Sequence, residues 1–512
     1  MSFSTVLSAA VRGLEVQFVY VEADTSRGLP MFHMVGYLSA EVKEAGERVR
    51  TAIRNTGWEL PPKKVVINLA PVEVKKRGAS LDLPMAVALL VSLNMIKAER
   101  LTGTLIIGEL SLDGRIRKVS GILPIVAAAK EHGCKACIIP ALNAAEGGLI
   151  EGIQIIGAAH LRAVCDYLNG KSDIDDEREK SETLPPMTSV TKKPDYAEVK
   201  GQHLLKRATE VAVAGNHNIL YIGPPGSGKT MVARRIPTIL PPLTKEESIE
   251  ITKVYSVLGL VDKKHPLLRE RPFRSIHHTV TKAALIGGGQ IPVPGELSMA
   301  NGGVLFLDEL AEFQKPVLEV LRQPMEEKVI QIVRSRGNYQ FPANAMLVAA
   351  MNPCPCGNYP DYSKCSCTDG QIRQYQAKIS QPFLDRMDLC IEVPKVEYDT
   401  LNSGQAEESS AVIRSRVCRA RDIQNERYIG KEIMTNEQIG KYELERYCCL
   451  DPEGQNLMEL AFTKLSLTAR SYYKIIKVAR TIADLAGSKD IGAIHLREAI
   501  GYRMIDKKYW RR

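Results

Sequence analysis

The sequence predicts an α/β protein with three folded regions, and three observations carry this prediction. Apolar residues 218–222 (NILYI) precede a glycine-rich turn and a helix-compatible stretch from Lys229, the strand–loop–helix order of a phosphate-binding unit. Two more apolar segments, 304–307 (VLFL) and 346–352 (MLVAAMN), end in acidic and amide groups. From about Ser403 onward the strand signals stop, and 457–485 has helical periodicity.

A linker is expected at residues 171–198, which combine dense charge, Pro, Ser and Thr with few large apolar side chains. Such a segment buries too little apolar surface to offset the entropy of ordering it. Ahead of it, residues 1–170 mix strand-like alternation near Val16 with helical spacing at 41–55, which predicts an α+β domain. Residues 199–402 then form the α/β core, and 403–512 form a helical domain.

Composition restricts the class of protein. The chain has 512 residues, of which 45% are hydrophobic and 25% charged, so it needs more than one core. A net charge of +9 is compatible with a polyanionic partner without identifying one. Its longest apolar stretch, 86–96, is about half of a membrane span. Eleven dispersed cysteines and no basic, apolar leader favour a cytoplasmic protein with reduced thiols.

The glycine-rich turn reads GPPGSGKT and matches the Walker A pattern in full. Its glycines allow backbone N–H groups to close around phosphate oxygens at a helix N-terminus. The lysine reaches the outer phosphates of ATP, and the threonine hydroxyl binds Mg²⁺. The predicted nucleotide-binding residues are Gly223, Pro224, Pro225, Gly226, Ser227, Gly228, Lys229 and Thr230.

The acidic pair that follows VLFL completes a hydrolytic site. Asp308 is expected to hold Mg²⁺ together with Thr230, and Glu309 to orient and deprotonate the attacking water. Asn352 ends the next strand and can hydrogen-bond the same water or the γ-phosphate. Ligands bind at the carboxyl ends of parallel strands, which places these residues at one edge of the sheet.

The order GPPGSGKT, GGVLFLDEL, MLVAAMNPCPCG, PFLDRMDL and LTARSYYKIIKVARTIADL resembles the magnesium-chelatase-like AAA+ ATPases, most closely the YifB/ComM family, along nearly the whole chain. The resemblance implies that Asn352 is sensor 1 and that Arg470 is sensor 2. It also implies that Arg386 is the arginine finger offered to the ATP of a neighbouring subunit. A finger acting between subunits implies a ring, usually of six.

The same resemblance assigns two further segments of the core. Residues 273–297 resemble the helix-2 insertion of this clade, and 326–341 resemble its pre-sensor-1 hairpin. In ring helicases of the clade such hairpins point into the central pore. Lys328, Arg334 and Arg336 would there contact DNA phosphates, with Arg334 and Arg336 as the main grip.

The N-terminal region resembles the Lon-protease-like domain, which raises a peptidase as a rival function. Ser80 lies in GASLD, where the Lon family has its nucleophile. Leu123 stands where that family has the lysine base. Because a serine needs a base to accept its proton, we expect Ser80 to be inert and the domain to be a scaffold or a DNA-contacting module.

Four cysteines follow sensor 1 in two close CxC clips. Thiolates in two clips separated by a short loop suit tetrahedral Zn²⁺, which can fold a loop that lacks its own core. Free or redox-active thiols remain the alternative. The predicted zinc ligands are Cys354, Cys356, Cys365 and Cys367.

These features favour a hexameric, ATP-driven motor that acts on single-stranded or branched DNA as a helicase or branch-migration translocase in recombination or natural transformation. An ATPase of the chelatase type that remodels a protein partner is the first alternative. A Lon-like peptidase is disfavoured by Leu123. The expected cofactors are ATP, Mg²⁺ and structural Zn²⁺.

Overall fold

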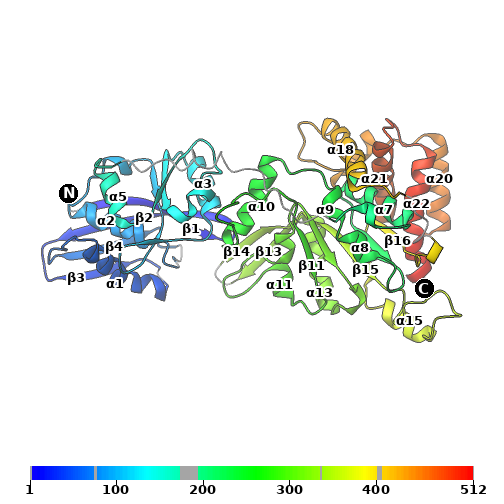
Figure 1. The fold of residues 1–512 in the computed structure, drawn as a ribbon, viewed down its shortest axis with the longest axis horizontal. Coiled ribbons are helices and arrows are strands. Elements are labelled where there is room, and N and C mark those ends of the chain that lie inside the picture. Colours follow the sequence, from blue (N-terminus) through cyan, green and yellow to red (C-terminus); the bar gives the residue numbers. More distant parts are fainter. Residues whose placement is uncertain are drawn as a thin grey trace. The chain divides into compact units, whose positions relative to one another are not determined.

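The computed structural model describes most of the chain, drawn as a ribbon in Figure 1. The described residues are 3–37, 39–73, 76, 78–172, 194–334, 337–399 and 406–510. The chain divides into two compact units, each assembled from separate stretches of sequence. The first comprises Met1–Thr188, Lys245–Leu268 and Ile332–Gln340, and the second comprises Ser189–Thr244, Arg269–Gln331 and Phe341–Arg512.

The first unit contains a seven-stranded mixed sheet with the order β3-β4-β2-β1-β5-β8-β9. Strands β1 and β2 form an antiparallel hairpin that pairs Phe3 with Asp24 and Arg12 with Glu15. The pairs β1/β5, β5/β8 and β8/β9 are parallel. The strands are β1 (Phe3–Arg12), β2 (Glu15–Ser26), β3 (Met31–Val35), β4 (Lys64–Ala70), β5 (Thr104–Ile106), β8 (Ala136–Pro140) and β9 (Gln154–Ala158), with a short pair β6 (Glu109–Leu110) and β7 (Ile116–Arg117).

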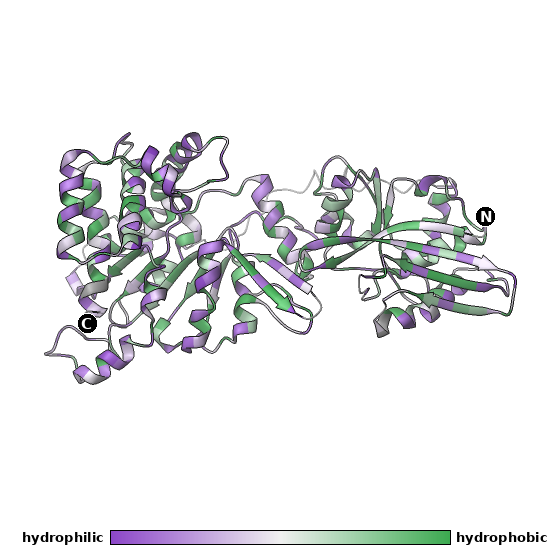
Figure 2. Ribbon diagram, turned by 180° about the vertical axis from the view of Figure 1, so that it is seen from behind, coloured by the Kyte–Doolittle hydropathy of each residue, from purple (hydrophilic) through white to green (hydrophobic). Residues whose placement is uncertain are grey.

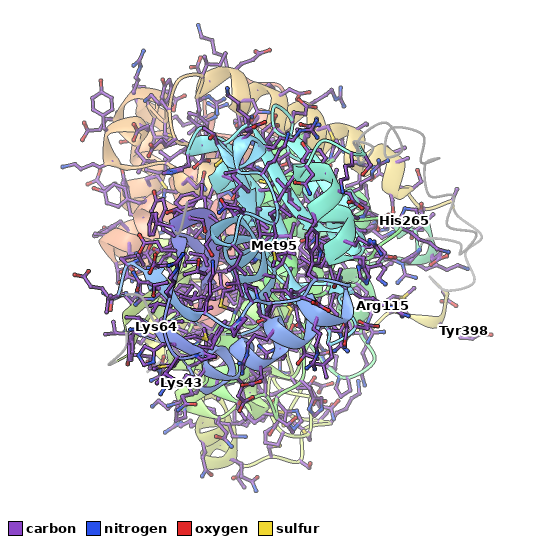
Figure 3. All side chains as sticks on the ribbon, turned by 90° about the vertical axis from the view of Figure 1, so that its left-hand side faces the viewer. Lys43, Lys64, Met95, Arg115, His265 and Tyr398 are labelled. Carbon is purple, nitrogen blue, oxygen red and sulfur yellow. The ribbon has the colours of Figure 1, made fainter. Side chains whose placement is uncertain are left out.

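Successive strand residues of this sheet belong to two different hydrophobic cores. Ile138 packs with residues of α1, α2 and α5, whereas Ile139 packs with residues of α3 and α4. Lys43 of α1 and Lys64 of β4 are exposed on the surface of this unit (Figure 3). The helices are α1 (Ala40–Asn55), α2 (Asp82–Ser92), α3 (Ile122–Glu131), α4 (Ala144–Gly147) and α5 (Leu161–Leu168).

Helix α10 (Lys245–Val257) belongs to the first unit although it follows the Walker A segment in sequence. Its Ser256 carbonyl accepts a hydrogen bond of 2.9 Å from the amide of Gly121, and its Ser256 hydroxyl bonds the buried carboxylate of Glu146. Asn143 donates to the other oxygen of Glu146 at 2.9 Å. These bonds satisfy buried polar groups and fix the end of α10 against α3.

The second unit contains a five-stranded sheet with the order β11-β12-β15-β10-β16, in which every neighbouring pair is parallel. All residues of β10, β12 and β15 are buried, as expected for central strands covered on both faces. The strands are β10 (Ile219–Ile222), β11 (Phe273–Ile276), β12 (Val304–Leu307), β15 (Met346–Met351) and β16 (Leu389–Glu392).

The C-terminal helices share one hydrophobic core with this sheet, because Ile219 and Val348 pack in the same cluster as Val417 and Leu496. In Figure 2 these helices carry both hydrophobic and hydrophilic colouring. The helices of the unit are α7 (His203–Gly215), α8 (Lys229–Ala233), α9 (Ile236–Ile239), α11 (Lys282–Ile286), α12 (Glu296–Met299), α13 (Lys315–Glu319), α14 (Arg322–Glu327), α15 (Asp369–Gln376), α16 (Gln381–Leu384), α18 (Ser410–Arg427), α19 (Lys441–Tyr447), α20 (Pro452–Lys464), α21 (Ala469–Leu485) and α22 (Ala493–Trp510).

The fold-class prediction is confirmed: a mixed α/β region is followed by a parallel α/β core and by helices. Of the expected linker 171–198, residues 173–193 lie outside the described residues. The residues after them belong to the second unit, where Tyr196 is fully buried and its amide donates to Ser410 Oγ at 2.9 Å. Among the residues that the structure describes, no helix combines the length and apolarity that crossing a bilayer requires.

A buried polar cluster joins β10, β16 and α21. His217 Nε2 lies 2.8 Å from Thr481 Oγ1, and the amide of Asn218 donates to Asp388 Oδ2 at 2.8 Å. Lys474 Nζ lies 2.8 Å from Asp388 Oδ1. Burial lowers the pKa of His217 to about 4, with nearby cations acting in the same direction and Asp388 opposing them. The imidazole is therefore neutral at physiological pH.

This low pKa makes the stability of the second unit depend on pH. Unfolded His217 takes up a proton near pH 6.5, whereas the folded imidazole does so only near pH 4, so stability falls as the pH drops between these values. The loss is at most about 3 kcal/mol. Asp388, whose pKa the Lys474 ammonium holds at about 2 against the effect of burial, acts at lower pH. Urea unfolding of the wild type and of His217→Gln at several pH values measures this, and equal pH dependence would contradict it.

Candidate active site

Three loops with polar side chains meet at the carboxyl edge of the parallel sheet. Leu307 pairs with Ala349, and Ile222 pairs with Met351, so β12, β15 and β10 end side by side. Gly223, Asp308 and Asn352 each directly follow one of these strands. Residues more than 120 positions apart in sequence are thus brought together, as a ligand site in an open α/β sheet requires.

The Walker A loop has the backbone conformation that its glycines permit. Gly226 and Gly228 adopt φ angles of +74° and +89°, which other residues seldom adopt. A Cβ on Gly223 would lie 2.3 Å from the carbonyl oxygen of Val393, so that position has no room for a side chain. Helix α8 begins at Lys229, directly after this loop, and its first amides face the loop.

The ammonium group of Lys229 folds back onto the loop. Its Nζ donates to the carbonyl oxygens of Gly223 at 2.7 Å and Pro224 at 2.8 Å, and lies 3.4 Å from Asn352 Oδ1. Burial lowers the pKa of Lys229 to about 8, and the nearby Asp308 carboxylate raises it. A partly desolvated ammonium interacts strongly with anions, because little hydration has to be given up.

Thr230 and Asp308 bring a hydroxyl and a carboxylate together. Thr230 Oγ1 donates to Asp308 Oδ2 at 2.8 Å, and the amide of Glu309 donates to Asp308 Oδ1 at 3.0 Å. Oxygen ligands of this kind suit Mg²⁺, which binds through one or two protein oxygens together with water and phosphates. These two residues therefore fit the metal expected with ATP.

Glu309 adopts a φ of +53°, an uncommon left-handed conformation for a residue with a side chain. Its carboxylate is more than half exposed, and Oε2 lies 3.4 Å from Nδ1 of His278. Sequence reasoning left His277 and His278 without a role. Both histidines directly follow β11, which pairs in parallel with β12. Polar residues at the carboxyl ends of neighbouring parallel strands lie at the same edge of the sheet, and this position could have indicated that the histidines lie near Glu309.

The two predicted arginines lie together and apart from the Walker residues. Arg386 donates to Glu326 Oε2 at 2.9 Å, and Arg470 forms an ion pair with Oε1 of the same carboxylate. Among the described residues, no hydrogen bond or ion pair joins either arginine to Lys229 or Asp308. The structure thus unites the phosphate loop, the acidic pair and Asn352, and separately unites the two arginines.

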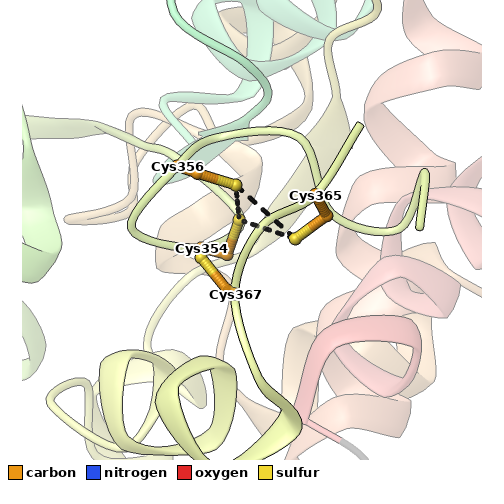
Figure 4. Close-up of side chains that lie close together, drawn as sticks. All are labelled: Cys354, Cys356, Cys365 and Cys367. Atoms are coloured by element: carbon orange, nitrogen blue, oxygen red, sulfur yellow. Dashed lines mark hydrogen bonds between the residues drawn. The ribbon is translucent and has the colours of Figure 1, made fainter. Parts of the chain in front are cut away.

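The four cysteines form one compact cluster (Figure 4). The Sγ atom of Cys354 lies 3.4 Å from that of Cys356 and 3.8 Å from that of Cys365. All four Sγ atoms, including that of Cys367, lie within 4.8 Å of one another. Four thiolates bound tetrahedrally to one zinc ion would have their sulfurs about 3.8 Å apart, so the donor set fits such an ion.

The cysteine loop also contacts the phosphate loop. A Cβ on Gly357 would lie 2.4 Å from Cδ of Pro225, so the two backbones pass closely. Gln376 Nε2 donates to the carbonyl of Pro353 at 3.1 Å, and Trp510 Nε1 donates to the carbonyl of Gln376 at 3.1 Å. The indole of Trp510 is therefore engaged within its own unit.

Of the two arginines predicted to contact DNA most strongly, the structure describes one. Arg334 is exposed on β13 (Val329–Arg334), which pairs with β14 (Gly337–Pro342) in a two-stranded sheet. Arg336 lies outside the described residues. At the other end of the hairpin, Lys328 forms a 3.2 Å ion pair with Glu437.

Among the described residues, the two Lon-like positions, Ser80 and Leu123, do not form a nucleophile–base pair. The side chain of Leu123 is fully buried in the core around α3, and its amide donates to Ser256 Oγ at 3.3 Å. The carbonyl of Ser80 accepts a bond from the amide of Gly108 at 2.9 Å. A buried leucine supplies no proton acceptor for the Ser80 hydroxyl.

Fold and site together define a magnesium-chelatase-like AAA+ ATPase. A family model described as "Magnesium chelatase, subunit ChlI" matches residues 195–401. The models "Subunit ChlI of Mg-chelatase" and "Magnesium chelatase, subunit ChlI C-terminal" match residues 21–143 and 407–503.

Full-length relatives narrow this class. The chain is 41% identical to the competence protein ComM of Haemophilus influenzae, over 98% of each chain. It is 40% identical to YifB of Salmonella typhimurium, over 99% of this chain and 98% of the relative. The chain therefore belongs to the YifB/ComM family. It is also 30% identical over 127 residues to Lon protease 2 of Bacillus subtilis, a match to 25% of this chain and 22% of that protein.

Proposed function

We propose that this protein is an ATP-hydrolysing motor that works as a hexameric ring on single-stranded or branched DNA. The observation that carries the ATPase proposal is the convergence of Lys229, Thr230, Asp308 and Asn352 at one edge of the sheet. Full-length similarity to a competence protein supports DNA as the substrate, because competence is the uptake of DNA. The proposal includes helicase or branch-migration activity in recombination or natural transformation, which the family resemblance implies.

We place this activity in the cytoplasm, where ATP and DNA are both present. All eleven cysteines are free thiols, as expected where the glutathione pool keeps thiols reduced. The match to the chelatase ATPase subunit keeps remodelling of a protein partner as the alternative function.

In this proposal each group at the sheet edge has one role. Lys229 compensates the charge of the outer phosphates, and Thr230 with Asp308 holds Mg²⁺, which neutralises charge that develops on the phosphates. Glu309 orients the attacking water and accepts its proton. Asn352, next to the Lys229 ammonium, orients the water or the γ-phosphate.

Arg386 completes the site of a neighbouring subunit, and Arg470 acts as sensor 2. Phosphoryl transfer needs positive charge near the γ-phosphate, and an arginine finger supplies it. Both arginines lie at Glu326 rather than at the Walker residues of their own chain. That placement supports a trans role for Arg386 and a ring, while Arg470 keeps the sensor 2 role that the resemblance implies.

The test of the proposed function is the ATPase rate with and without forked or single-stranded DNA. We expect DNA to raise the rate of the wild type, because the motor spends ATP to move along its substrate. Hydrolysis that ignores every DNA structure but responds to a protein partner would reject the DNA motor in favour of the remodelling alternative.

Two substitutions separate nucleotide binding from hydrolysis. Lys229→Ala should abolish nucleotide binding, because the phosphate charge loses its nearest cation. Glu309→Gln should retain binding and lower kcat by about 10²–10⁴-fold, the range for a missing general base. Nucleotide titration and steady-state ATPase measure both. Near-normal turnover of Glu309→Gln would exclude Glu309 as the base.

The hairpin should grip DNA through its phosphates. A motor that moves along any sequence contacts the backbone, so affinity should fall steeply with salt. Reversing Arg334 and Arg336 to Glu should weaken binding, flatten the salt dependence and abolish DNA stimulation while basal ATPase survives. Lys464→Glu, an exposed site on α20, is the control for charge reversal. Equal affinities and salt slopes for wild type and variant would exclude the hairpin.

We also propose that the cysteine cluster binds one structural zinc ion. Its sulfurs already lie at separations that fit tetrahedral coordination, and an ion there would fix the loop that contacts Pro225. Redox-active thiols are the alternative use of the same cluster.

Purified protein should therefore contain about one zinc per chain. Substituting Cys354 and Cys365 with Ser should release the metal, lower the unfolding temperature and raise the KM for ATP, because the loop supports the phosphate loop. Cys449→Ser, at an exposed cysteine outside the cluster, is the control. Metal analysis that finds no zinc, with four titratable thiols in the cluster, would favour the redox alternative.

A further inference from the structure

Glu326 is the meeting point of two arginines from different parts of the chain. It lies on α14, whereas Arg386 follows α16 and Arg470 is in the first turn of α21. Arg386 Nη2 donates to Oε2 at 2.9 Å, and Arg470 pairs with Oε1. One carboxylate thus holds two guanidinium groups, one on each oxygen.

The arrangement adds little to stability. Glu326 is 39% exposed and Arg470 is 46% exposed, and ion pairs between exposed groups contribute weakly to folding because water screens them. Arg386 is 10% exposed and is fixed independently, since its Nε and Nη1 donate to the carbonyls of Arg322 and Pro382. The contact therefore does little to hold the fold together. It directs Arg470 and occupies Nη2 of Arg386, the nitrogen that the two carbonyls leave available.

A carboxylate and a phosphoryl group are both oxyanions. The guanidinium group of arginine can donate parallel N–H bonds to two oxygens of either one. An N–H group that donates to Glu326 becomes available to the γ-phosphate of ATP only when that bond breaks.

We propose that Glu326 is a positioning residue that pairs Arg386 with Arg470 in the free subunit and is exchanged for the γ-phosphate of ATP held by a neighbouring copy. This inference rests on the proposed function, because it needs Arg386 to act between subunits. Helix α14 ends at Glu327, and the chain continues through Lys328 into β13. The exchange thus releases a restraint at the base of the hairpin when ATP binds.

The test is the ATP concentration at which subunits assemble, measured by sedimentation velocity with Glu309→Gln protein so that ATP persists. Glu326→Gln should lower the half-maximal ATP concentration about two- to fivefold, the range set by exposed ion pairs, because the competing anion is gone. The control is Glu327→Gln, whose carboxylate accepts a bond from Gln323 at 2.8 Å. It should leave the midpoint unchanged, and both variants should keep the wild-type unfolding temperature.

A second comparison separates positioning from a structural role. In an Arg386→Ala background the shift caused by Glu326→Gln should shrink, because a coupled pair gives non-additive effects. The inference would be overturned if Glu326→Gln left the half-maximal ATP concentration for assembly unchanged or raised it. An equal shift of that concentration in both backgrounds would also overturn it. Neither result would contradict the proposed motor. Failure of Glu309→Gln protein to assemble at any ATP concentration would instead refute the ring, and this inference with it.

Discussion

The parallel pairing of β12, β15 and β10 is the constraint on which the candidate active site depends. Parallel strands all end at the same edge, so each loop that follows a strand delivers its first residue to one place. Gly223, Asp308 and Asn352 occupy those positions. The order of the strands therefore brings Thr230 next to Asp308 and Lys229 next to Asn352.

Two further features, the cysteine loop and the pair of arginines, are held by other elements of the second unit. The cysteine loop passes Pro225 closely and is tied through Gln376 to the last helix, so a metal there would steady the phosphate loop from outside. The arginines are gathered at Glu326, on the helix that runs into the hairpin. The two arginine contacts are ion pairs with a partly exposed carboxylate, and such pairs are weak.

The N-terminal unit includes two segments that lie within the ATPase region of the sequence. Residues 245–268 and 332–340 belong to that unit, and the Ser256–Glu146 bond fixes α10 against α3. Arg12 lies over the ring of Tyr339 at 5.1 Å, which ties the hairpin to β1. Leu123, at the position of the absent lysine base, is part of the core that α10 covers through Ile249. A scaffold that holds both segments fits these contacts.

The sequence by itself determined the local chemistry. Three short contiguous patterns carry it: the strand–loop–helix order at 218–230, the acidic pair after VLFL and the paired cysteine clips. Each can be recognised from neighbouring residues alone, because its chemistry depends little on residues distant in the sequence. Only the tertiary structure decided which distant groups meet. His278 reaches Glu309 because β11 pairs with β12, and Arg386 shares Glu326 with Arg470 because three helical segments converge. Such contacts depend on sheet order and helix packing, which no local spacing encodes.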